Sequence, residues 1–437
     1  MKRLVLAAVL LAACNSGGEA STTSSVSPVG TTAPSVTTTT QPPLASVRVT
    51  LSEVESAAAF GATIQVGDSV QLAPEDSAVV MVRSDQPVTL DIHYVVDGEE
   101  VEPSWTQTVE AAADGSTELI VEQPWRRTVA PQDPIVLGWQ AFGTPERYLG
   151  ELQAAPGLTV TSPRWWSLDE EGFLIGETDP EFVGNAHEMG LKVWPYAGNA
   201  FDPVRTRRAL AAPQQRKLLA AQLSAGAQLA GADGVNIDYE SFSSADRDTF
   251  VDFVAQLTEF VHGWGGVVSV DITVRTRDFT TVPEASYDIF DRRALAEVSD
   301  YLALMAYDEY TTVRPAGPTA SHEWAEKAVY WLMRYVDPHQ ILLGIPFYSR
   351  IWNPEDLNKP KAADIGTIVE LAESNPGTFD PEFELDRVEL EDGRFFWAED
   401  YDSMAIRMEL ARDSGVAGVA AWRLGFDTPE LWPIVAP

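Results

Sequence analysis

The stretch Asp233-Gly234-Val235-Asn236-Ile237-Asp238-Tyr239-Glu240 decides the fold of this 437-residue chain. It begins as an apolar strand and places two carboxylic acids, Asp238 and Glu240, where that strand ends. Side chains alternate across a strand, so Asn236, Asp238 and Glu240 share one face and Ile237 lies on the other. If Ile237 faces covering helices, the acidic row faces the interior of a closed sheet. Two neighbouring carboxylates repel, which raises one pKa and creates a candidate general acid.

A strand-then-helix pattern repeats from Pro134 onward. Apolar strands that alternate with amphipathic helices predict a parallel sheet covered by helices. Eight strands can be counted, which predicts an α/β fold, a closed (β/α)8 TIM barrel. They are predicted at residues 135–139, 158–162, 191–196, 234–238, 267–272, 301–306, 341–345 and 416–422. The gap between strands seven and eight is too long for one helix and predicts an inserted subdomain on the catalytic side.

The other strand ends carry further candidates, because the catalytic residues of such barrels lie at the C-terminal ends of the strands. Met305, Tyr307 and Asp308 follow strand six, and Trp422 ends strand eight. A chain with this many acidic residues also carries pairs of acidic side chains on surfaces without a binding site, so a surface acidic patch is the alternative interpretation. Asp238 and Glu240 are expected to face the barrel interior and to lie where the strand ends. Both features favour an active site over a surface patch.

Composition excludes several classes of function. The chain has 65 Asp and Glu against 30 Lys and Arg, a net charge of −35 that repels phosphate backbones and argues against nucleic-acid binding. A single cysteine and five scattered histidines exclude a cysteine-based zinc site and lack the spacing of common zinc motifs. There is no glycine-rich phosphate loop. We therefore expect no metal and no cofactor.

The first residues predict an export signal. Lys2 and Arg3 precede an apolar run, residues 4–13, that is too short to span a bilayer of roughly 30 Å. The run ends in Leu11-Ala12-Ala13-Cys14, which resembles a bacterial lipobox and implies cleavage before Cys14 and lipidation of its thiol. The alternative is an ordinary secretion signal that contains a cysteine. Lipidation would place the protein outside the cytoplasm, anchored to the bacterial membrane.

Two segments separate this signal, residues 1–14, from the barrel. Residues 15–45 are rich in Ser, Thr, Gly and Pro and predict a disordered tether with a reach on the order of 30 Å. Residues 46–130 show period-two alternation, as in Val88-Thr89-Leu90-Asp91-Ile92, and predict a small, sandwich-like all-β domain. A spacer role and a carbohydrate- or wall-binding role both remain open for that domain.

At this point the sequence resembles glycoside hydrolase family 18. The family pattern D-G-x-D-x-D-x-E is met by residues 233–240 with one departure, Asn236, and M-x-Y-D is met by Met305 to Asp308. Trp422 matches the tryptophan of the family's eighth strand. Further stretches resemble bacterial spore-cortex peptidoglycan glucosaminidases and chitinase-domain proteins, namely residues 162–172, 190–203, 304–310, 343–352 and 415–425. The resemblance covers residues 134–435 and assigns a catalytic domain to residues 134–437.

The resemblance implies a retaining hydrolase of β-1,4-linked N-acetylglucosamine polymers that uses no enzyme nucleophile. Glu240 would be the general acid and base, and Asp238 would bind the acetamido N–H of the substrate. Tyr307 would hold the acetamido oxygen with support from Asp308, and Trp422 would form the apolar floor. The remaining substrate-binding candidates are Asn236, which can hydrogen-bond but not ionise, Met305, and four tryptophans near strand ends that serve equally well as packing: Trp139, Trp165, Trp194 and Trp352.

Three classes of function remain open. An active glycosidase leads, because an inactive sugar-binding member of the fold usually loses the acid and Glu240 is retained. An adhesion or structural lipoprotein is the third. Peptidoglycan is favoured over chitin as the substrate, since a tethered enzyme meets the cell's own wall first, although wall-binding repeats are not recognisable in residues 46–130. We expect a monomer whose partners are the polysaccharide and, through Cys14, the membrane.

Overall fold

The structure is a computed structural model that describes residues 133–277, 288–311 and 315–436 with their side chains, and only the backbone of the strands before residue 133. The chain divides into two compact units, Met1–Pro124 and Trp125–Pro437. Cys14 and residues 15–43 of the predicted tether lie outside the described residues. In the part of the chain that the structure describes, no helix has the length and apolar character needed to cross a membrane.

The N-terminal unit contains two four-stranded sheets. In the first, β2 pairs with β5 in antiparallel and with β8 in parallel orientation, and in the second, β3 and β7 pair with β6 in antiparallel orientation. The first sheet has the order β1 (Leu4–Val5), β5 (Ser77–Arg83), β2 (Leu44–Leu51) and β8 (Ser116–Val121). The second has the order β4 (Asp68–Leu72), β3 (Phe60–Val66), β6 (Val88–Val96) and β7 (Glu99–Val109).

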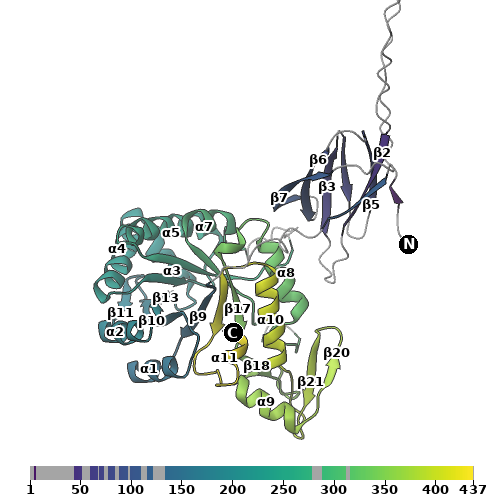
Figure 1. The fold of residues 1–437 in the computed structure, drawn as a ribbon. Coiled ribbons are helices and arrows are strands. Elements are labelled where there is room, and N and C mark those ends of the chain that lie inside the picture. The colour runs from purple at the N-terminus through teal and green to yellow at the C-terminus, as the bar shows by residue number, and fades with distance from the viewer. Residues whose placement is uncertain are drawn as a thin grey trace, which may run out of the picture. The chain divides into compact units, whose positions relative to one another are not determined.

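The second unit is a closed barrel of eight parallel strands, which confirms the predicted (β/α)8 fold (Figure 1). Each strand pairs with its neighbour, and β10 pairs with β9 to close the ring. The barrel strands are β9 (Ile135–Gln140), β10 (Val160–Leu168), β13 (Tyr196–Gly198), β14 (Gly234–Asp238), β15 (Val267–Thr273), β16 (Tyr301–Met305), β17 (Ile341–Pro346) and β23 (Gly418–Trp422). A short strand, β11 (Leu174–Gly176), pairs antiparallel with the end of β10.

The third strand differs from the prediction. A continuous strand over residues 191–196 was expected, but the chain forms two short pieces, β12 (Lys192–Val193) and β13. Trp194 and Pro195 lie between them. Proline has no N–H to donate to the sheet and therefore interrupts the ladder. The second piece ends two residues later than predicted, at Gly198.

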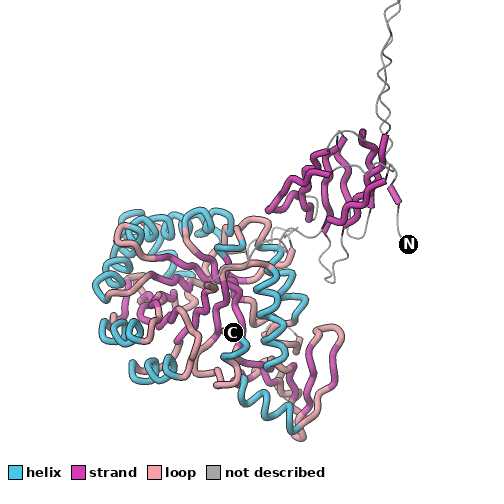
Figure 2. Tube along the Cα trace, in the orientation of Figure 1, coloured by secondary structure: helices cyan, strands magenta, loops and turns pink. Residues whose placement is uncertain are grey.

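The helices surround the strands, as Figure 2 shows. Several begin where a side chain accepts a hydrogen bond from the first turn: Thr144, Asp179, Asp202, Asp291, Asp364 and Asp400. Such capping satisfies backbone N–H groups that have no partner inside the helix. The helices of the barrel are α1 (Pro145–Gln153), α2 (Pro180–Glu188), α3 (Pro203–Leu210), α4 (Pro213–Ala230), α5 (Arg247–His262), α7 (Arg292–Val298), α8 (His322–Leu332), α10 (Tyr401–Asp413) and α11 (Trp432–Val435).

The predicted insertion between the seventh and eighth strands is present. It contains a two-stranded and a three-stranded antiparallel sheet and one helix, which project from one side of the barrel in Figure 1. Its elements are β18 (Tyr348–Ile351), β19 (Lys361–Asp364), α9 (Ile365–Ser374), β20 (Thr378–Asp380), β21 (Leu385–Glu389) and β22 (Phe395–Trp397). Ile351, Ile368, Val388 and Phe396 form its buried core.

The ring closes tightly between β23 and β9. Gly418 has a φ of 157°, and a Cβ built there would lie 1.9 Å from the carbonyl oxygen of Ile135. Only glycine allows this approach, because any side chain would overlap the neighbouring strand. Closure fixes the positions of the strand ends, and these ends carry the site.

Candidate active site

A pocket of about 440 Å³ opens at the C-terminal ends of the barrel strands. Its wall contains residues from several strand ends and the loops that follow them, as expected for an active site in this fold. We call it the acidic pocket, because five of its lining residues are carboxylic acids. The lining residues are Phe201, Asp238, Glu240, Asp271, Thr273, Val274, Met305, Tyr307, Asp308, Glu309, Thr311, Trp324 and Trp422.

Asp238 and Glu240 form a hydrogen-bonded pair at the end of β14. Burial raises the pKa of Glu240 to about 8, and the neighbouring charge of Asp238 adds to this effect. Burial also raises the pKa of Asp238, to about 6, while the hydrogen bond from Glu240 and the charge of Arg164 act in the opposite direction. Near neutral pH the pair therefore holds a protonated Glu240 beside an ionised Asp238. This is the protonation state that a general acid with a charged partner needs.

Asn236 lies beneath this pair and is completely buried. Trp139 Nε1 and Ser162 Oγ donate to its Oδ1, at 3.0 and 3.3 Å. Its Nδ2 donates to Ser269 Oγ and to Asp271 Oδ1, at 2.9 and 2.7 Å. Because the indole N–H can only donate, it fixes which way the amide points. Asn236 was predicted to bind substrate, but its side chain has its hydrogen bonds within the protein and does not line the pocket.

Asp271 is an acid that the sequence did not single out. It stands on β15 and lines the pocket with only 1% of its surface exposed. Burial raises its pKa well above the usual range, and the charge of Asp238 raises it further. The register pairs Ile237 with Val270, so Asp238 and Asp271 follow side by side on adjacent strands.

Aromatic rings form one wall of the pocket. The rings of Tyr307 and Trp422 are nearly parallel, with centroids 6.3 Å apart, and Trp139 packs behind both. Burial raises the pKa of Tyr307 well above its usual range, and the charge of Asp271 has the same effect, so its hydroxyl stays protonated as a hydrogen-bond donor. The two rings give this wall an apolar surface that carries a single hydroxyl, an arrangement common in pockets that bind small molecules.

Asp308 is fixed by two residues of β18, Tyr348 and Arg350. Arg350 donates to both of its oxygens, Nε to Oδ1 at 2.8 Å and Nη2 to Oδ2 at 2.6 Å, and Tyr348 Oη donates to Oδ1 at 2.5 Å. The backbone of Asp308 is left-handed, with a φ of 60°. A bidentate pair with arginine fixes the position of this carboxylate.

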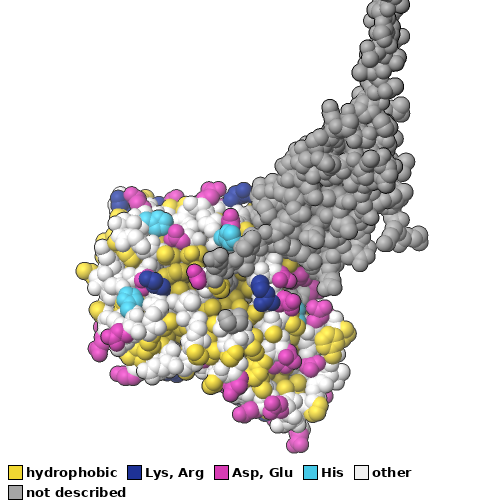
Figure 3. All heavy atoms as spheres, viewed as in Figure 1, with side chains coloured by type: hydrophobic (Ala, Val, Ile, Leu, Met, Phe, Trp, Pro, Cys, Tyr) yellow, Lys and Arg dark blue, Asp and Glu magenta, His cyan; other side chains and the backbone are white. Residues whose placement is uncertain are grey.

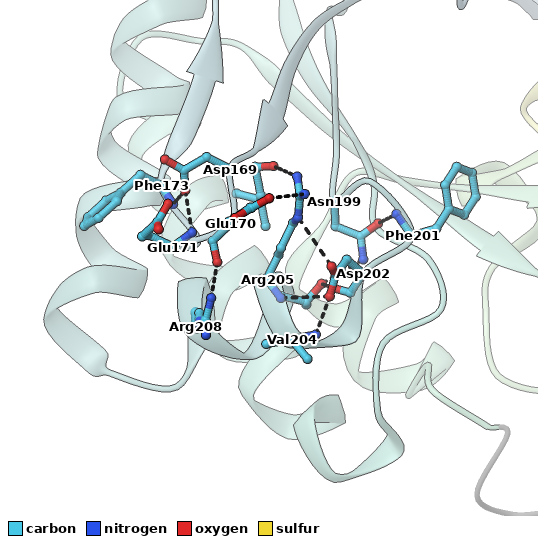
Figure 4. A network of polar contacts seen from close by, with 12 residues as sticks. Asp169, Glu170, Glu171, Phe173, Asn199, Phe201, Asp202, Val204, Arg205 and Arg208 are labelled. Atoms are coloured by element: carbon cyan, nitrogen blue, oxygen red, sulfur yellow. Dashed lines mark hydrogen bonds and ion pairs between the residues drawn. The ribbon is translucent and has the colours of Figure 1, made fainter.

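The loop after β13 supports Glu240 from the other side. Asn199 Oδ1 accepts from the N–H of Glu240 at 3.1 Å, and its Nδ2 donates to the carbonyl of Glu240 at 2.6 Å. The same oxygen accepts from the N–H of Phe201, and Nδ2 also donates to Thr206 Oγ1. Figure 4 shows the Phe201 ring pointing away from this polar network. Phe201 lines the pocket with 65% of its surface exposed and has a left-handed backbone, at a φ of 55°.

A buried ion pair supports the far side of the pocket. Arg407 on α10 pairs with Glu399 at 2.9 Å, and neither side chain has more than 1% exposure. Arg407 also donates to the carbonyl of Ala320, whose N–H donates to Glu399. The neighbouring Thr319 Oγ1 accepts from the N–H of Arg350. The pair thus holds the segment that positions the partner of Asp308.

The structure brings six of the predicted site residues into the acidic pocket: Asp238, Glu240, Met305, Tyr307, Asp308 and Trp422. The four weaker tryptophan candidates lie outside it and are buried in packing. Trp194 stacks on Tyr301, Trp165 packs edge-on against Trp166, and Trp352 donates to the carbonyl of Gly317 within the inserted subdomain. All four side chains are buried, and their role in substrate binding stays a prediction.

The main residues missed were Asp271, Phe201, Tyr348 and Arg350. Asp271 had one usable signal, since Ser269 and Asp271 alternate with the apolar residues of β15. Tyr348 and Arg350 lay in a stretch quoted for its resemblance, but only the fold brings them to Asp308. Phe201 also lay in a quoted stretch, residues 190–203, but nothing in the sequence set it apart from its neighbours as a residue of the pocket.

Within the described residues, no group of three or more His, Cys, Asp or Glu is placed to hold a metal ion. Asp and Glu side chains are spread over the face shown in Figure 3. This surface repels a polyanion at short range, and salt screens the repulsion beyond roughly 8–10 Å.

A (β/α)8 barrel with paired carboxylic acids and an aromatic wall at its strand ends defines the class of barrel glycosidases. The chain belongs to the glycosyl hydrolases family 18, whose sequence description matches residues 182–427. That match covers the Asp238–Glu240 pair, Tyr307 and Trp422, and it confirms the resemblance found in the sequence.

The chain is similar in sequence to several named proteins. It is 19% identical over 284 residues to the glycosylase YvbX of Bacillus subtilis, covering 62% of this chain and 81% of that protein. It is 22% identical over 232 residues to the cortical fragment-lytic enzyme of Bacillus anthracis, covering 47% of this chain and 49% of that one. The chain thus spans about half the length of several curated relatives that it matches.

Solved structures share the fold. The chitinase from Chromobacterium violaceum aligns with a TM-score of 0.62 at 20% identity, covering 69% of this chain and 98% of that one. The spore cortex-lytic enzyme SleL of Bacillus cereus aligns with a TM-score of 0.62 at 18% identity, covering 69% and 73%.

Proposed function

We propose that this protein is a membrane-anchored, retaining glycosidase that hydrolyses β-1,4 linkages of N-acetylglucosamine-containing polymers, with peptidoglycan as its substrate. One observation carries the proposal. Asp238 and Glu240 form a buried, hydrogen-bonded pair in a pocket that also contains Tyr307 and Trp422. The pair supplies an acid that is protonated near neutral pH, and the aromatic residues supply the binding surface.

The pair is too close for a mechanism with an enzyme nucleophile. In retaining glycosidases of that kind the two carboxyl groups lie about 5–5.5 Å apart, and in inverting ones about 6.5–9.5 Å. Asp238 and Glu240 are hydrogen-bonded to each other, so they do not flank a substrate in either of these arrangements. Asp308 is paired with Arg350, and Asp271 is bonded to Asn236 beneath the pair. These contacts favour a nucleophile that belongs to the substrate, its 2-acetamido oxygen.

In the proposed mechanism Glu240 gives its proton to the glycosidic oxygen as the bond to the anomeric carbon breaks. The acetamido oxygen attacks that carbon and forms an oxazolinium ion. Asp238 accepts a hydrogen bond from the acetamido N–H and stabilises the positive charge, and the hydroxyl of Tyr307 orients the acetamido oxygen. Glu240, now ionised, then takes a proton from the water that opens the ring.

The choice of polymer rests on location and on relatives. A lipid anchor at Cys14 and a tether with a reach on the order of 30 Å would hold the pocket near the cell's own wall. The cortical fragment-lytic enzymes and the spore cortex-lytic enzyme SleL, to which the chain is similar, are named for lysis of the spore cortex or of its fragments. Similarity to chitinases supports chitin-type oligosaccharides as the second candidate.

The test compares two substrates and three forms of the protein. Purified sacculi and chitin oligomers are digested in parallel, and the new reducing ends are identified by mass spectrometry after borohydride reduction. We expect reducing N-acetylglucosamine ends from sacculi. The Glu240→Gln variant should lose at least about 10²-fold in kcat while still binding substrate.

Glu188→Gln is the matched control, since Glu188 is an exposed glutamate at the end of α2. It should match the wild type. Cleavage of chitin oligomers with intact sacculi would overturn the choice of polymer. Binding of either substrate without turnover would identify an inactive sugar-binding protein instead.

A further inference from the structure

A second pocket, of about 240 Å³, lies next to the acidic pocket. Thr273 and Val274 line the acidic pocket, and the residue that follows them, Arg275, lines the second one. Arg292 Nη2 donates to the carbonyl of Thr273 at 3.0 Å. The two pockets therefore share the end of β15.

The charge of this second pocket is opposite to that of the chain. The protein has a net charge of −35, yet arginines outnumber acids in the pocket wall. We call it the arginine pocket. Such a cluster attracts anions in a protein that otherwise repels them. Its charged lining residues are Arg247, Arg275, Arg292 and Arg293 against Asp288 and Asp291.

The arginine pocket already binds one carboxylate, which belongs to the chain itself. Arg275 Nη1 donates to Asp288 Oδ2 and Arg292 Nη1 donates to Asp288 Oδ1, both at 2.6 Å. The guanidinium of Arg275 also lies over the ring of Trp331, 4.5 Å from its centroid. Arginines held in this way present their N–H groups in a fixed geometry that matches a carboxylate.

Two other arginines and one indole N–H are placed to bind a second anion. In the described parts of the chain, no ion pair joins Arg247 or Arg293 to an acidic side chain, and Arg247 Nε is buried without a hydrogen-bond partner. Trp331 lines the same pocket with 5% of its surface exposed, and its Nε1 also lacks a hydrogen-bond partner there. A buried N–H without an acceptor costs free energy, which a ligand oxygen would recover.

We propose that the arginine pocket binds a peptide-borne carboxylate of the same polymer whose sugar occupies the acidic pocket. Arg247 and Arg293 bind the carboxylate, and the rings of Trp331 and Tyr335 contact the apolar part of the peptide. A peptide spans up to about 3.3–3.6 Å per residue, so a short one reaches from one pocket to its neighbour. This inference rests on the proposed function and names the part of the substrate that distinguishes peptidoglycan from uncharged chitin.

The test measures binding to sacculi by sedimentation, with full-length protein in detergent solution that carries Glu240→Gln so that the polymer stays intact. Arg247→Gln/Arg293→Gln removes two guanidinium groups. We expect its Kd for native sacculi to rise at least about fivefold over that of the Glu240→Gln parent, because the lost hydrogen bonds join charged groups. On sacculi whose carboxylates are amidated with ethanolamine and a carbodiimide, parent and variant should bind equally within about twofold. Repulsion from the acidic surface acts on both proteins alike and cancels from this comparison.

Lys217→Gln/Arg412→Gln is the matched control, since it removes two positive charges at exposed positions of α4 and α10. It should bind native sacculi within about twofold of the parent. If the arginine double variant does not fold, Arg293→Gln, at an exposed position, decides with a rise of at least about threefold.

Four results would overturn the inference: a parent that does not bind native sacculi, a folded variant with an unchanged Kd, a difference that persists on amidated sacculi, or a difference that is lost once hydrofluoric acid has removed phosphate polymers from the sacculi. The last result would assign the pocket to phosphate. Failure of the proposed function is distinguished by turnover. A wild type that does not cleave sacculi contradicts that function, while the sedimentation comparison still decides the role of the arginine pocket.

Discussion

The side-chain amide of Asn199 binds both main-chain polar groups of Glu240. Oδ1 accepts from the N–H at 3.1 Å and Nδ2 donates to the carbonyl at 2.6 Å, as a neighbouring strand would do. Glu240 lies beyond the last residue of β14, where the ladder to β13 has ended. Asn199 thus extends the sheet by one residue and fixes the backbone of the acid.

Asn199→Ala should therefore impair catalysis more than substrate binding. We expect kcat to fall at least about tenfold, because a general acid must lie within hydrogen-bond reach of the atom it protonates. The two freed main-chain groups should also cost about 1–3 kcal/mol each in folding free energy. Steady-state kinetics and thermal melting measure the two effects.

Asn185→Ala is the control for this variant. Asn185 also donates to a main-chain carbonyl, that of Glu181, but on the exposed surface of α2. It should leave kcat unchanged. An Asn199→Ala enzyme that keeps its kcat and loses only stability would show that the amide has no part in placing Glu240.

The catalytic rate, measured as kcat/KM, should show a bell-shaped dependence on pH. Burial raises the pKa of Asp238 to about 6 and that of Glu240 to about 8. The rate rises as Asp238 loses its proton through the lower value, and it falls as Glu240 loses its proton through the upper value. Because the two groups interact, the limbs report the pair rather than single residues. A profile of kcat/KM from pH 4 to 10 on a neutral chitin oligomer measures them, and a profile that stays flat to pH 10 would contradict Glu240 as the acid.

Folding stability should respond to the same ionisation. The pKa of Glu240 rises from an ordinary 4.5 to about 8 in the folded protein. Between these values the unfolded chain is ionised at this residue and the folded protein is protonated, so the contribution is present below pH 4.5 and is lost as pH rises through 8. Glu240→Gln cannot ionise and avoids this loss. Its Tm relative to wild type should therefore increase from pH 4.5 to pH 8.5, by at least about 2 °C, and a constant difference in calorimetry would refute the shift.

The sequence predicted the barrel and the acid because both depend on local pattern. The alternation of side chains along residues 234–240 predicted that Asp238 and Glu240 face inward, and this prediction needed no information about the neighbouring strands. The four tryptophans near strand ends could not be sorted in this way, since the choice between packing and pocket depends on the neighbouring strand. Asp271 was missed for a related reason. Its importance comes from the register that places it beside Asp238, and register is a property of two strands rather than of one.

The acetamido group should be the reacting partner of Asp238 and Tyr307. Asp238→Ala and Tyr307→Phe should lower kcat more than they raise KM, because their contacts strengthen as charge develops in the transition state. A thiazoline analogue of the oxazolinium ion should inhibit the wild type competitively. Trapping of a covalent glycosyl-enzyme by a fluorosugar would contradict this mechanism, since it requires a carboxylate nucleophile.

The anchor is tested at Cys14, which lies outside the described residues. The proposal rests on the only cysteine of the chain standing at the position that a lipobox requires. Each buried methylene of an acyl chain adds about 0.8 kcal/mol, and stable anchoring takes more than one chain. The wild type expressed in bacteria should therefore enter the detergent phase in a cloud-point separation, and Cys14→Ser should either enter the aqueous phase or keep an uncleaved signal, which mass spectrometry of the N-terminus distinguishes. Ser16→Ala, two residues further along, should behave as the wild type. A wild-type protein that stays in the aqueous phase with a free Cys14 thiol would show that this residue is not lipidated.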